Sequence, residues 1–264
     1  MSIALITGAS SGLGVEFARQ LARAGHDITL VARRHDRLDA VAADLQIHYP
    51  IRAEPLVADL ATDAGVQTVV DYINSNPGLE ILVNNAGFGT KGLFFQADLA
   101  GQEQMHQLHV IATMRLCHAA LGPMVARKSG AIINVSSVAG FTLGVGSVSY
   151  GATKAWMNVF TRGLDAELHQ IGSPVKVQAL CPGFTITEFH DSLQTDRSLV
   201  PRWLWLRAED VVAASLAALK KNKVIVVTGW QYRLFVTILR FLPYSALRRL
   251  AQASGRRMKR GAAE

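Results

Sequence analysis

Cysteine is scarce in this chain, and no leader-like segment precedes its first apolar run. Cys117 and Cys181 are the only two cysteines among 264 residues, too few for a disulfide framework and not at the spacing of metal ligands. The first apolar run begins at residue 3 with no basic stretch before it, so we expect no cleaved targeting peptide. These absences favour a cytoplasmic protein and predict no metal site.

Acidic residues are nearly missing from the end of the chain. Residues 220–264 hold eleven Lys or Arg and one acid, Glu264, whereas the other residues include 16 basic and 19 acidic ones. The net charge of +7 therefore comes from the tail. A basic tail can bind nucleic acid, but no groove of interleaved basic and aromatic residues accompanies it. We therefore do not expect nucleic-acid binding.

Long uninterrupted apolar runs are also absent from the tail. Apolar residues recur at helical steps over residues 232–250, but Arg233, Arg240 and Pro243 interrupt any segment long enough to cross a bilayer. We expect a basic amphipathic helical extension over residues 230–264. Two interpretations remain open: the extension lies on an anionic membrane surface, or it covers the substrate opening of its own or a neighbouring subunit.

Strand–helix alternation is what the chain has in abundance. Half of its residues are apolar, enough for a buried core, and six apolar runs of strand length alternate with helical patterns. Polar residues or glycines follow at the carboxyl end of each run: 3–7, 27–32, 53–58, 79–83, 130–137 and 175–180. This order predicts an α/β fold, a single doubly wound Rossmann domain with a parallel sheet, over residues 1–229.

The turn after the first run is the strongest local signal of a ligand. Its glycines allow a tight turn and a close approach of an anion to the N-terminus of the next helix, where free N–H groups and the helix dipole favour negative charge. We therefore expect the pyrophosphate of a dinucleotide here. The residues expected to contact it are Gly8, Ser10, Ser11, Gly12, Leu13 and Gly14.

The second strand ends in Arg33 and Arg34. An acid at this position would accept hydrogen bonds from the adenosine ribose, whereas an arginine pairs with a 2′-phosphate. The nearest acids that follow, Asp36 and Asp39, fall on the next helix. The sequence thus favours NADP(H) over NAD(H). Further strand ends expected to line the cofactor are Asp59, Leu60, Asn85, Ala86 and Gly87.

Tyr150 and Lys154 carry the expected chemistry. They are four residues apart in a helical stretch, so they share a helix face. An ammonium group near the phenol would lower the phenol pKa below its ordinary value of about 10. A carbonyl that accepts hydride develops negative charge on its oxygen, and it needs a proton and a hydrogen-bond donor. Tyr150 is the expected proton donor.

Together these motifs resemble those of the short-chain dehydrogenase/reductase family. The matching residues, in family order, are Thr7-Gly8-x-x-x-Gly12-x-Gly14, Asn84-Asn85-Ala86-Gly87, Ser137, Tyr150-x-x-x-Lys154 and Pro182-Gly183. The resemblance implies a seven-stranded sheet with residues 224–227 as its last strand, and a homodimer or homotetramer. It also implies that Ser137, 13 residues before Tyr150, holds the carbonyl oxygen, and that Tyr150 and Lys154 lie against the nicotinamide ribose, which the lysine holds.

One position departs from the family pattern. Many relatives carry an asparagine in the long helix that we expect over residues 102–127, where this chain has His109. A histidine both donates and accepts hydrogen bonds, so it could take part in a proton relay. The alternative is a helix histidine satisfied by a backbone carbonyl. His109 is therefore a candidate catalytic residue.

The resemblance also places a substrate lid over residues 184–207, directly after Pro182 and Gly183, with Thr185 or Thr187 meeting the cofactor. Apolar residues crowd the lid and the loops expected to face it: Phe88, Phe94, Phe95, Phe141, Leu143, Val145, Trp203, Leu204 and Trp205. They either line a site for an apolar ketone or aldehyde or pack the lid down.

Two functions from different classes follow. The first is an NADPH-dependent carbonyl reductase, reversible as an alcohol dehydrogenase. The second is a non-catalytic NADP(H)-binding sensor or scaffold that uses its tail for partners. The complete set of Ser137, Tyr150 and Lys154 favours the enzyme, whereas the departure at His109 is the feature that favours the alternative.

Overall fold

A computed structural model of the chain describes residues 2–189 and 200–260, with side chains up to residue 252. Residues 190–199 of the expected lid and the last four residues of the tail lie outside the described residues. Seven parallel strands form one sheet, as the family resemblance implied, in the order β3-β2-β1-β4-β5-β6-β7. The strands are β1 Ile3–Thr7, β2 Asp27–Ala32, β3 Ala53–Val57, β4 Leu79–Asn84, β5 Ala131–Val135, β6 Lys176–Cys181 and β7 Ile225–Val227.

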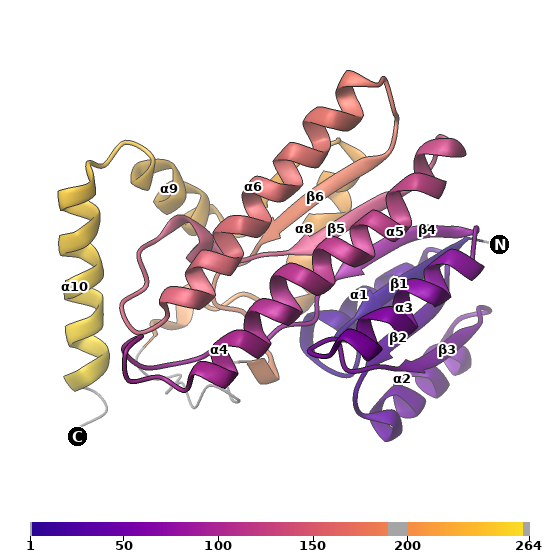
Figure 1. Cartoon of the computed structure of the whole chain (residues 1–264), viewed down its shortest axis with the longest axis horizontal. Helices are drawn as coiled ribbons and strands as arrows, with labels where there is room; N and C mark the ends of the chain where they lie inside the picture. Colours follow the sequence, from indigo (N-terminus) through magenta and orange to yellow (C-terminus); the bar gives the residue numbers. More distant parts are fainter. Residues whose placement is uncertain (1, 190–199, 261–264) are drawn as a thin grey trace.

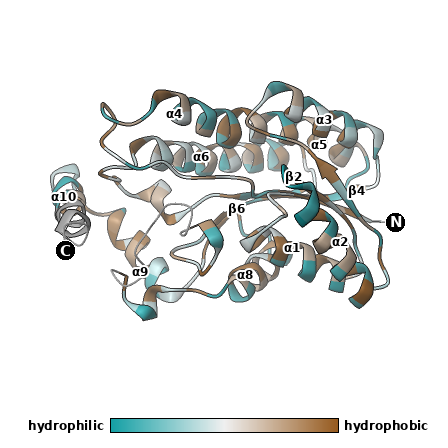
Figure 2. Ribbon diagram, turned by 90° about the horizontal axis from the view of Figure 1, so that it is seen from below, coloured by the Kyte–Doolittle hydropathy of each residue, from teal (hydrophilic) through white to brown (hydrophobic). Residues whose placement is uncertain are grey.

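Helices cover both faces of this sheet (Figures 1 and 2). One face carries α1 Gly12–Arg23, α2 His35–His48 and α8 Ala208–Lys220, and the other carries α3 Asp63–Ser75, α5 Thr113–Ala126 and α6 Val148–Gln170. The inner strands β1, β2, β4, β5 and β6 are buried on both sides, which explains why they read as continuous apolar runs, whereas the edge strands β3 and β7 are partly exposed. The predicted doubly wound Rossmann arrangement is confirmed.

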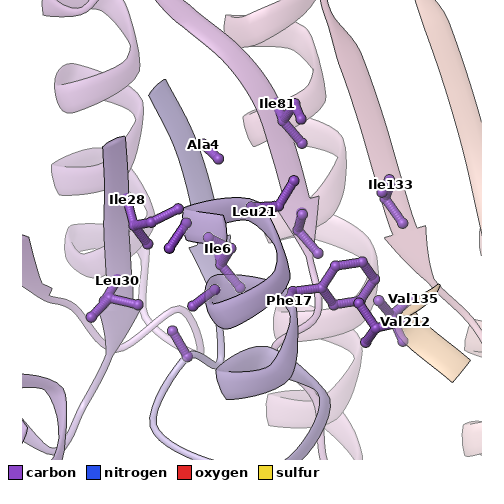
Figure 3. Close-up of a cluster of buried hydrophobic side chains, with 14 of the residues drawn as sticks. Ala4, Ile6, Phe17, Leu21, Ile28, Leu30, Ile81, Ile133, Val135 and Val212 are labelled. Atoms are coloured by element: carbon purple, nitrogen blue, oxygen red, sulfur yellow. The ribbon is translucent and has the colours of Figure 1, made fainter. Parts of the chain in front are cut away.

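Each face of the sheet has its own apolar core. On the first face, Phe17 and Leu21 of α1 pack with Ile6, Ile28 and Val212 (Figure 3). On the second face, a separate cluster joins α3, α5 and α6 to the same strands through residues such as Val69, Leu116 and Leu168. Burial of these side chains holds the helices on the sheet and thereby fixes where the loops at its edges lie.

The sheet positions a ligand site where its strand order reverses. β1 has β2 on one side and β4 on the other, and the connections lead away from it in both directions, which opens a crevice at the carboxyl ends of these strands. Thr7 closes the bottom of this crevice. Its hydroxyl accepts from the N–H groups of Asn85 and Ala86 at 2.9 and 3.0 Å, and the Asn85 amide donates to the Thr7 carbonyl at 2.9 Å.

The long helix expected over residues 102–127 is interrupted. It consists of α4 Leu99–His106, a π-helical segment η1 Gln107–Ala112, and α5. π-helical turns are rare, and they often occur at functional sites. By length and composition the whole stretch could cross a bilayer, but Leu116 and Met124 are fully buried in the core, so it is a core helix of the fold.

The C-terminal extension is helical, as predicted, and it is divided into two helices. α9 Trp230–Leu239 and α10 Tyr244–Arg260 are separated by the turn that contains Pro243. α9 packs on the Rossmann body through its buried Tyr232, Val236 and Leu239. α10 stands away from the sheet at the end of the molecule (Figures 1 and 2).

Candidate active site

The glycine turn after β1 needs its glycines. Gly8 and Gly12 have φ angles of +67° and +57°, which disfavour residues with a Cβ atom. A Cβ atom on Gly14 would lie 2.2 Å from the Gly8 carbonyl oxygen. Within the described residues, the Ser11 side chain makes no capping hydrogen bond to α1, whose N-terminal N–H groups therefore suit an anion. This turn fits the pyrophosphate of a dinucleotide.

The expected Arg33 and Arg34 lie beside this turn, together with a third arginine, Arg37, that the sequence analysis did not identify. The Arg34 guanidinium donates to the Ser10 hydroxyl at 2.9 Å, while Arg33 lies 4.0 Å from Asp59. Arg37, one helical turn after Arg34, joins the cluster through Glu188, which both arginines contact. Its three-residue spacing from Arg34 at the start of a helix was the available signal.

The structure brings together the residues expected to perform catalysis. Tyr150 and Lys154 share one face of α6, and the lysine ammonium lies 5.7 Å from the Tyr150 ring centroid. This ammonium is buried and donates to the Val135 carbonyl at the end of β5, at 2.8 Å. Burial lowers the pKa of Lys154 to about 8. Ser136, next to the expected catalytic serine, ties β5 to α6 by donating to the Lys154 carbonyl at 2.9 Å.

The acidity of Tyr150 differs from the expectation. Burial raises its pKa to about 12, and a hydrogen bond with the Ser137 hydroxyl opposes that rise. The expected lowering by Lys154 is not found, and the ammonium donates to the Val135 carbonyl instead. The phenol therefore stays protonated at neutral pH, in contact with the serine that the sequence pairs with it.

His109 is fully buried in the π-helical segment, with both ring nitrogens engaged. Nδ1 lies 2.9 Å from the Thr153 hydroxyl, which itself donates to the Tyr150 carbonyl. Since that hydroxyl has one proton, it must accept from His109, so Nδ1 carries the hydrogen. Burial lowers the pKa of His109 well below its ordinary value, and the positive charges of Lys154 and His106 act in the same direction. The ring is therefore neutral.

The other nitrogen of His109 holds the loop after β4. Nε2 accepts from the Phe88 N–H at 3.3 Å, and a Cβ atom on Gly87 would lie 2.7 Å from this nitrogen. One of the two alternatives from the sequence was a backbone carbonyl as the partner of His109, whereas the observed partners are a hydroxyl and an N–H group. His109 thus connects the Asn85–Ala86–Gly87 turn to the helix that carries Tyr150.

Three of the remaining expected cofactor residues have side chains with clear positions: Thr187 lies at the crevice, whereas Thr185 and Leu60 are buried. Thr187 lies over the glycine turn, because a Cβ atom on Gly12 would be 3.0 Å from the Thr187 Cβ. Thr185 is buried and donates to the Gly183 carbonyl at 3.0 Å. The Pro182 carbonyl accepts from Val138 at 3.0 Å. The Leu60 side chain packs in the core, so only its backbone can face a ligand.

The tail contributes a residue that the sequence did not indicate. The Tyr232 ring of α9 lies so close to Gly183 that a Cβ atom there would be 2.1 Å from the ring. Its hydroxyl accepts from the Phe184 N–H at 3.0 Å and donates to the Leu204 carbonyl at 2.7 Å. The start of the extension therefore holds both ends of the expected lid.

Apolar side chains lie on two neighbouring loops and beside Tyr150. The Gly92 N–H donates to the Gly146 carbonyl at 3.1 Å, which places two loops side by side. These loops expose large apolar side chains: Phe94, Phe95, Leu143 and Val145. The Phe189 ring lies 5.9 Å from the Tyr150 ring, whereas Trp205 packs against Phe184 at 5.4 Å. Some of the expected aromatics thus pack the lid, and others remain exposed.

A family model described as short chain dehydrogenase matches residues 2–198. The chain belongs to the short-chain dehydrogenase/reductase family. Among curated members of this family, a 3-oxoacyl-acyl-carrier-protein reductase of Aquifex aeolicus is 33% identical over 187 residues, which cover 70% of this chain and 75% of that protein. A sulfoacetaldehyde reductase of Chromohalobacter salexigens is 36% identical over 190 residues, 71% of this chain and 74% of that protein.

Solved structures of the same family share the fold. A short-chain dehydrogenase from Sphingobium yanoikuyae in complex with NADPH is 36% identical, with a TM-score of 0.82 over 87% of this chain and 89% of that one. A bulky-bulky ketone specific alcohol dehydrogenase from Comamonas testosteroni is 28% identical, with a TM-score of 0.77 over 98% and 94%. The protein is thus an oxidoreductase of a family that acts on CH–OH or carbonyl groups with a nicotinamide cofactor and is typically oligomeric.

Proposed function

We propose that the protein is an NADPH-dependent carbonyl reductase, reversible as an alcohol dehydrogenase, that acts on apolar ketones or aldehydes. The observation that carries the proposal is the meeting of Tyr150, Ser137 and Lys154 at the end of β5, beside the glycine turn. A bound nicotinamide would supply or accept the hydride. The residues that would hold the dinucleotide are the glycine turn, Arg34, Thr187 and Lys154.

The chain's own residues account for the proton. Ser137 holds the substrate oxygen by a hydrogen bond, and Tyr150 donates its phenolic proton to that oxygen as negative charge develops there. Lys154, when charged, stabilises the phenolate that remains. Burial of Lys154 and Tyr150 strengthens these interactions, because little water competes for the charges.

The preference for NADP(H) over NAD(H) is supported by the arginines beside the glycine turn. Arg34 and Arg37 already bind one carboxylate, and no acid stands at the end of β2 to receive ribose hydroxyls. The Sphingobium relative is in complex with NADPH. An apolar substrate is supported by the exposed side chains of the two loops near Tyr150, and the Comamonas relative is specific for bulky-bulky ketones.

A substrate series tests this function. Steady-state NADPH oxidation is measured with methyl ketones of increasing chain length and with a sulfonated aldehyde as the polar comparison. Each methylene that enters an apolar site should raise kcat/KM about fourfold, since it is worth about 0.8 kcal/mol. A preference for the sulfonated aldehyde would contradict the apolar substrate. NADPH binding without turnover of any carbonyl would favour the sensor or scaffold instead.

We propose that the protein is cytoplasmic and a homodimer or homotetramer, and that its tail contacts an anionic membrane surface. α9 exposes Trp230, Leu234 and Ile238 on the side opposite its buried residues, and no acid occurs between Asp210 and Glu264. Apolar side chains among arginines favour an anionic lipid interface.

Vesicle sedimentation tests this membrane contact. The full chain should sediment with anionic vesicles and not with zwitterionic ones, and the paired variant Arg240→Glu, Phe241→Ser should lose binding. Point changes are preferable to truncation at Lys223, because truncation removes the Tyr232 ring from Gly183. Unchanged sedimentation of the paired variant would favour packing of the tail on protein.

A further inference from the structure

Glu188 lies where the proposed function places the 2′-phosphate of the cofactor. Its carboxylate oxygens accept from Arg37 Nη1 at 2.8 and 3.0 Å, and one of them lies 3.8 Å from Arg34 Nη1. Arg34 also donates to Ser10 in the glycine turn. The carboxylate thus belongs to the same cluster as the groups expected to receive an anion from outside.

The residues on either side of Glu188 fix its place in the crevice. Thr187 lies over Gly12 in the glycine turn, and the Phe189 ring lies 5.9 Å from the Tyr150 ring. Residues 187–189 therefore run across the crevice, from the pyrophosphate turn to the catalytic tyrosine. Glu188 is the anionic residue of this short segment.

We infer that Glu188 is an internal competitor of the cofactor: its carboxylate occupies the Arg34–Arg37 pair in the cofactor-free protein and leaves when a 2′-phosphate binds. This inference rests on the proposed use of NADP(H). A carboxylate held at these two guanidinium groups repels an incoming phosphate, since both groups carry negative charge, and it occupies N–H donors that the phosphate would use. The phosphate is the stronger partner, because it carries more charge and three acceptor oxygens.

Exposure makes this displacement easy. The arginine side chains are 44% exposed and that of Glu188 is 55% exposed. Ion pairs in such positions contribute little to stability, so the carboxylate can leave at a small cost. NADPH, which brings a 2′-phosphate, would therefore move the Glu188 carboxylate away from the arginines, whereas NADH would leave it in place.

Calorimetry with cofactor fragments tests the inference without turnover. The probes are 2′,5′-ADP, which carries the 2′-phosphate, and 5′-AMP, which lacks it. Glu188→Gln should bind 2′,5′-ADP about two- to fivefold more tightly than the unaltered protein, the range expected for loss of an exposed ion pair. Its affinity for 5′-AMP should not change. Glu209→Gln is the matched control, because it removes one negative charge from the pair with Arg207 on the surface of α8.

A second variant tests whether the competition acts through Arg37. Arg37→Ala should weaken 2′,5′-ADP binding about tenfold, as expected for loss of a charge-assisted hydrogen bond. Glu188→Gln should then add little tightening in the Arg37→Ala background, since the two residues act through one contact.

Failure of the inference and failure of the proposed function give different results. If the unaltered protein prefers 2′,5′-ADP but Glu188→Gln binds it equally or less tightly, Glu188 is not a competitor. If the unaltered protein binds 2′,5′-ADP no better than 5′-AMP, the NADP(H) assignment itself is wrong, and the inference is wrong with it.

Discussion

Two neighbouring aromatic rings in this site, those of Tyr150 and His109, differ in burial and in hydrogen bonding. Their centroids lie 5.9 Å apart, edge to face. The Tyr150 ring is half-buried and its hydroxyl contacts Ser137. The His109 ring is fully buried, with one nitrogen bound to Thr153 and the other to the Phe88 N–H. Tyr150 has a proton to give toward the crevice, whereas His109 has both nitrogens engaged in holding the protein together.

The difference shows that closeness to the reacting group does not define a catalytic role. A ring nitrogen can carry a proton only if it can exchange one partner for another, and both partners of His109 are fixed by α6 and the loop after β4. We therefore expect His109 to act as a positioning residue. The proton relay considered from the sequence stays a prediction, and kinetics can decide between the two roles.

Removal of the phenolic hydroxyl of Tyr150 should have the largest effect on turnover. Tyr150→Phe should lower kcat by about 10²- to 10⁴-fold, the usual contribution of a general acid. NADPH affinity should stay within a few-fold, because the glycine turn and arginines are untouched. Steady-state NADPH oxidation and calorimetry measure the two quantities. Tyr49→Phe, at the end of α2 and far from the crevice, is the matched control, and turnover that survives in Tyr150→Phe would refute the assignment of the proton donor.

The pH dependence of reduction should follow Lys154. Burial lowers its pKa to about 8, so the ammonium is charged below pH 8 and neutral above it. Since the charged form stabilises the phenolate, kcat/KM for reduction should be level below that pH and fall about tenfold per pH unit above it. The residual activity of Lys154→Met should lack this fall. A level profile up to pH 10 in the unaltered enzyme would contradict the role of the ammonium.

Much of the fold was predictable because its signals are local. The strand ends, the glycine turn and the four-residue spacing of Tyr150 and Lys154 each depend on a few adjacent residues, and the observed strands begin and end within about two residues of the expected positions. The interruption of the long helix at Gln107–Ala112 was not predictable, because this segment contains neither glycine nor proline, the residues that usually mark a break in a helix.

The missed features of the site depend on residues distant in sequence. His109 meets Phe88 and Thr153, which are 21 and 44 residues away, and Arg37 meets Glu188 across 151 residues. The acidity of Tyr150 was misjudged for a similar reason. The spacing showed that Lys154 is near, but not that its ammonium is bound by the Val135 carbonyl or that burial dominates the phenol pKa.

Substitution of His109 should have a smaller effect on turnover than substitution of Tyr150. His109→Ala leaves the Phe88 N–H and the Thr153 hydroxyl without their shared partner, so we expect kcat to fall about tenfold, as for loss of one positioning contact. NADPH affinity should stay within a few-fold. The pH profile should keep its shape, because His109 is neutral throughout.

Thr153→Val sharpens this test. It removes the other half of the same contact, so it should lower kcat by a similar factor, and the double variant should be little worse than either single one. A proton relay predicts a different result. An inflection near neutral pH, present in the unaltered enzyme and lost in His109→Ala, would assign proton transfer to the ring and contradict the positioning role.

The smallest effect concerns stability in acid. The pKa of His109 lies well below its ordinary value of 6.5 in the folded state, because burial opposes the charged form. Above pH 6.5 the ring is neutral in both states. As the pH falls below 6.5, the unfolded chain binds a proton that the folded protein does not, so stability decreases.

Relative to His109→Asn, the unaltered protein should therefore lose about 1 kcal/mol of unfolding free energy between pH 6.5 and pH 5.5. Urea denaturation followed by tryptophan fluorescence at the two pH values measures this difference. His118→Asn is the matched control, because it replaces a histidine on the exposed side of α5, away from the buried contacts of His109. If His109→Asn and the unaltered protein lose stability equally in acid, then His109 takes up a proton in the folded state. His109 would then exchange protons despite its burial, and it would differ less from Tyr150 than its two hydrogen bonds indicate.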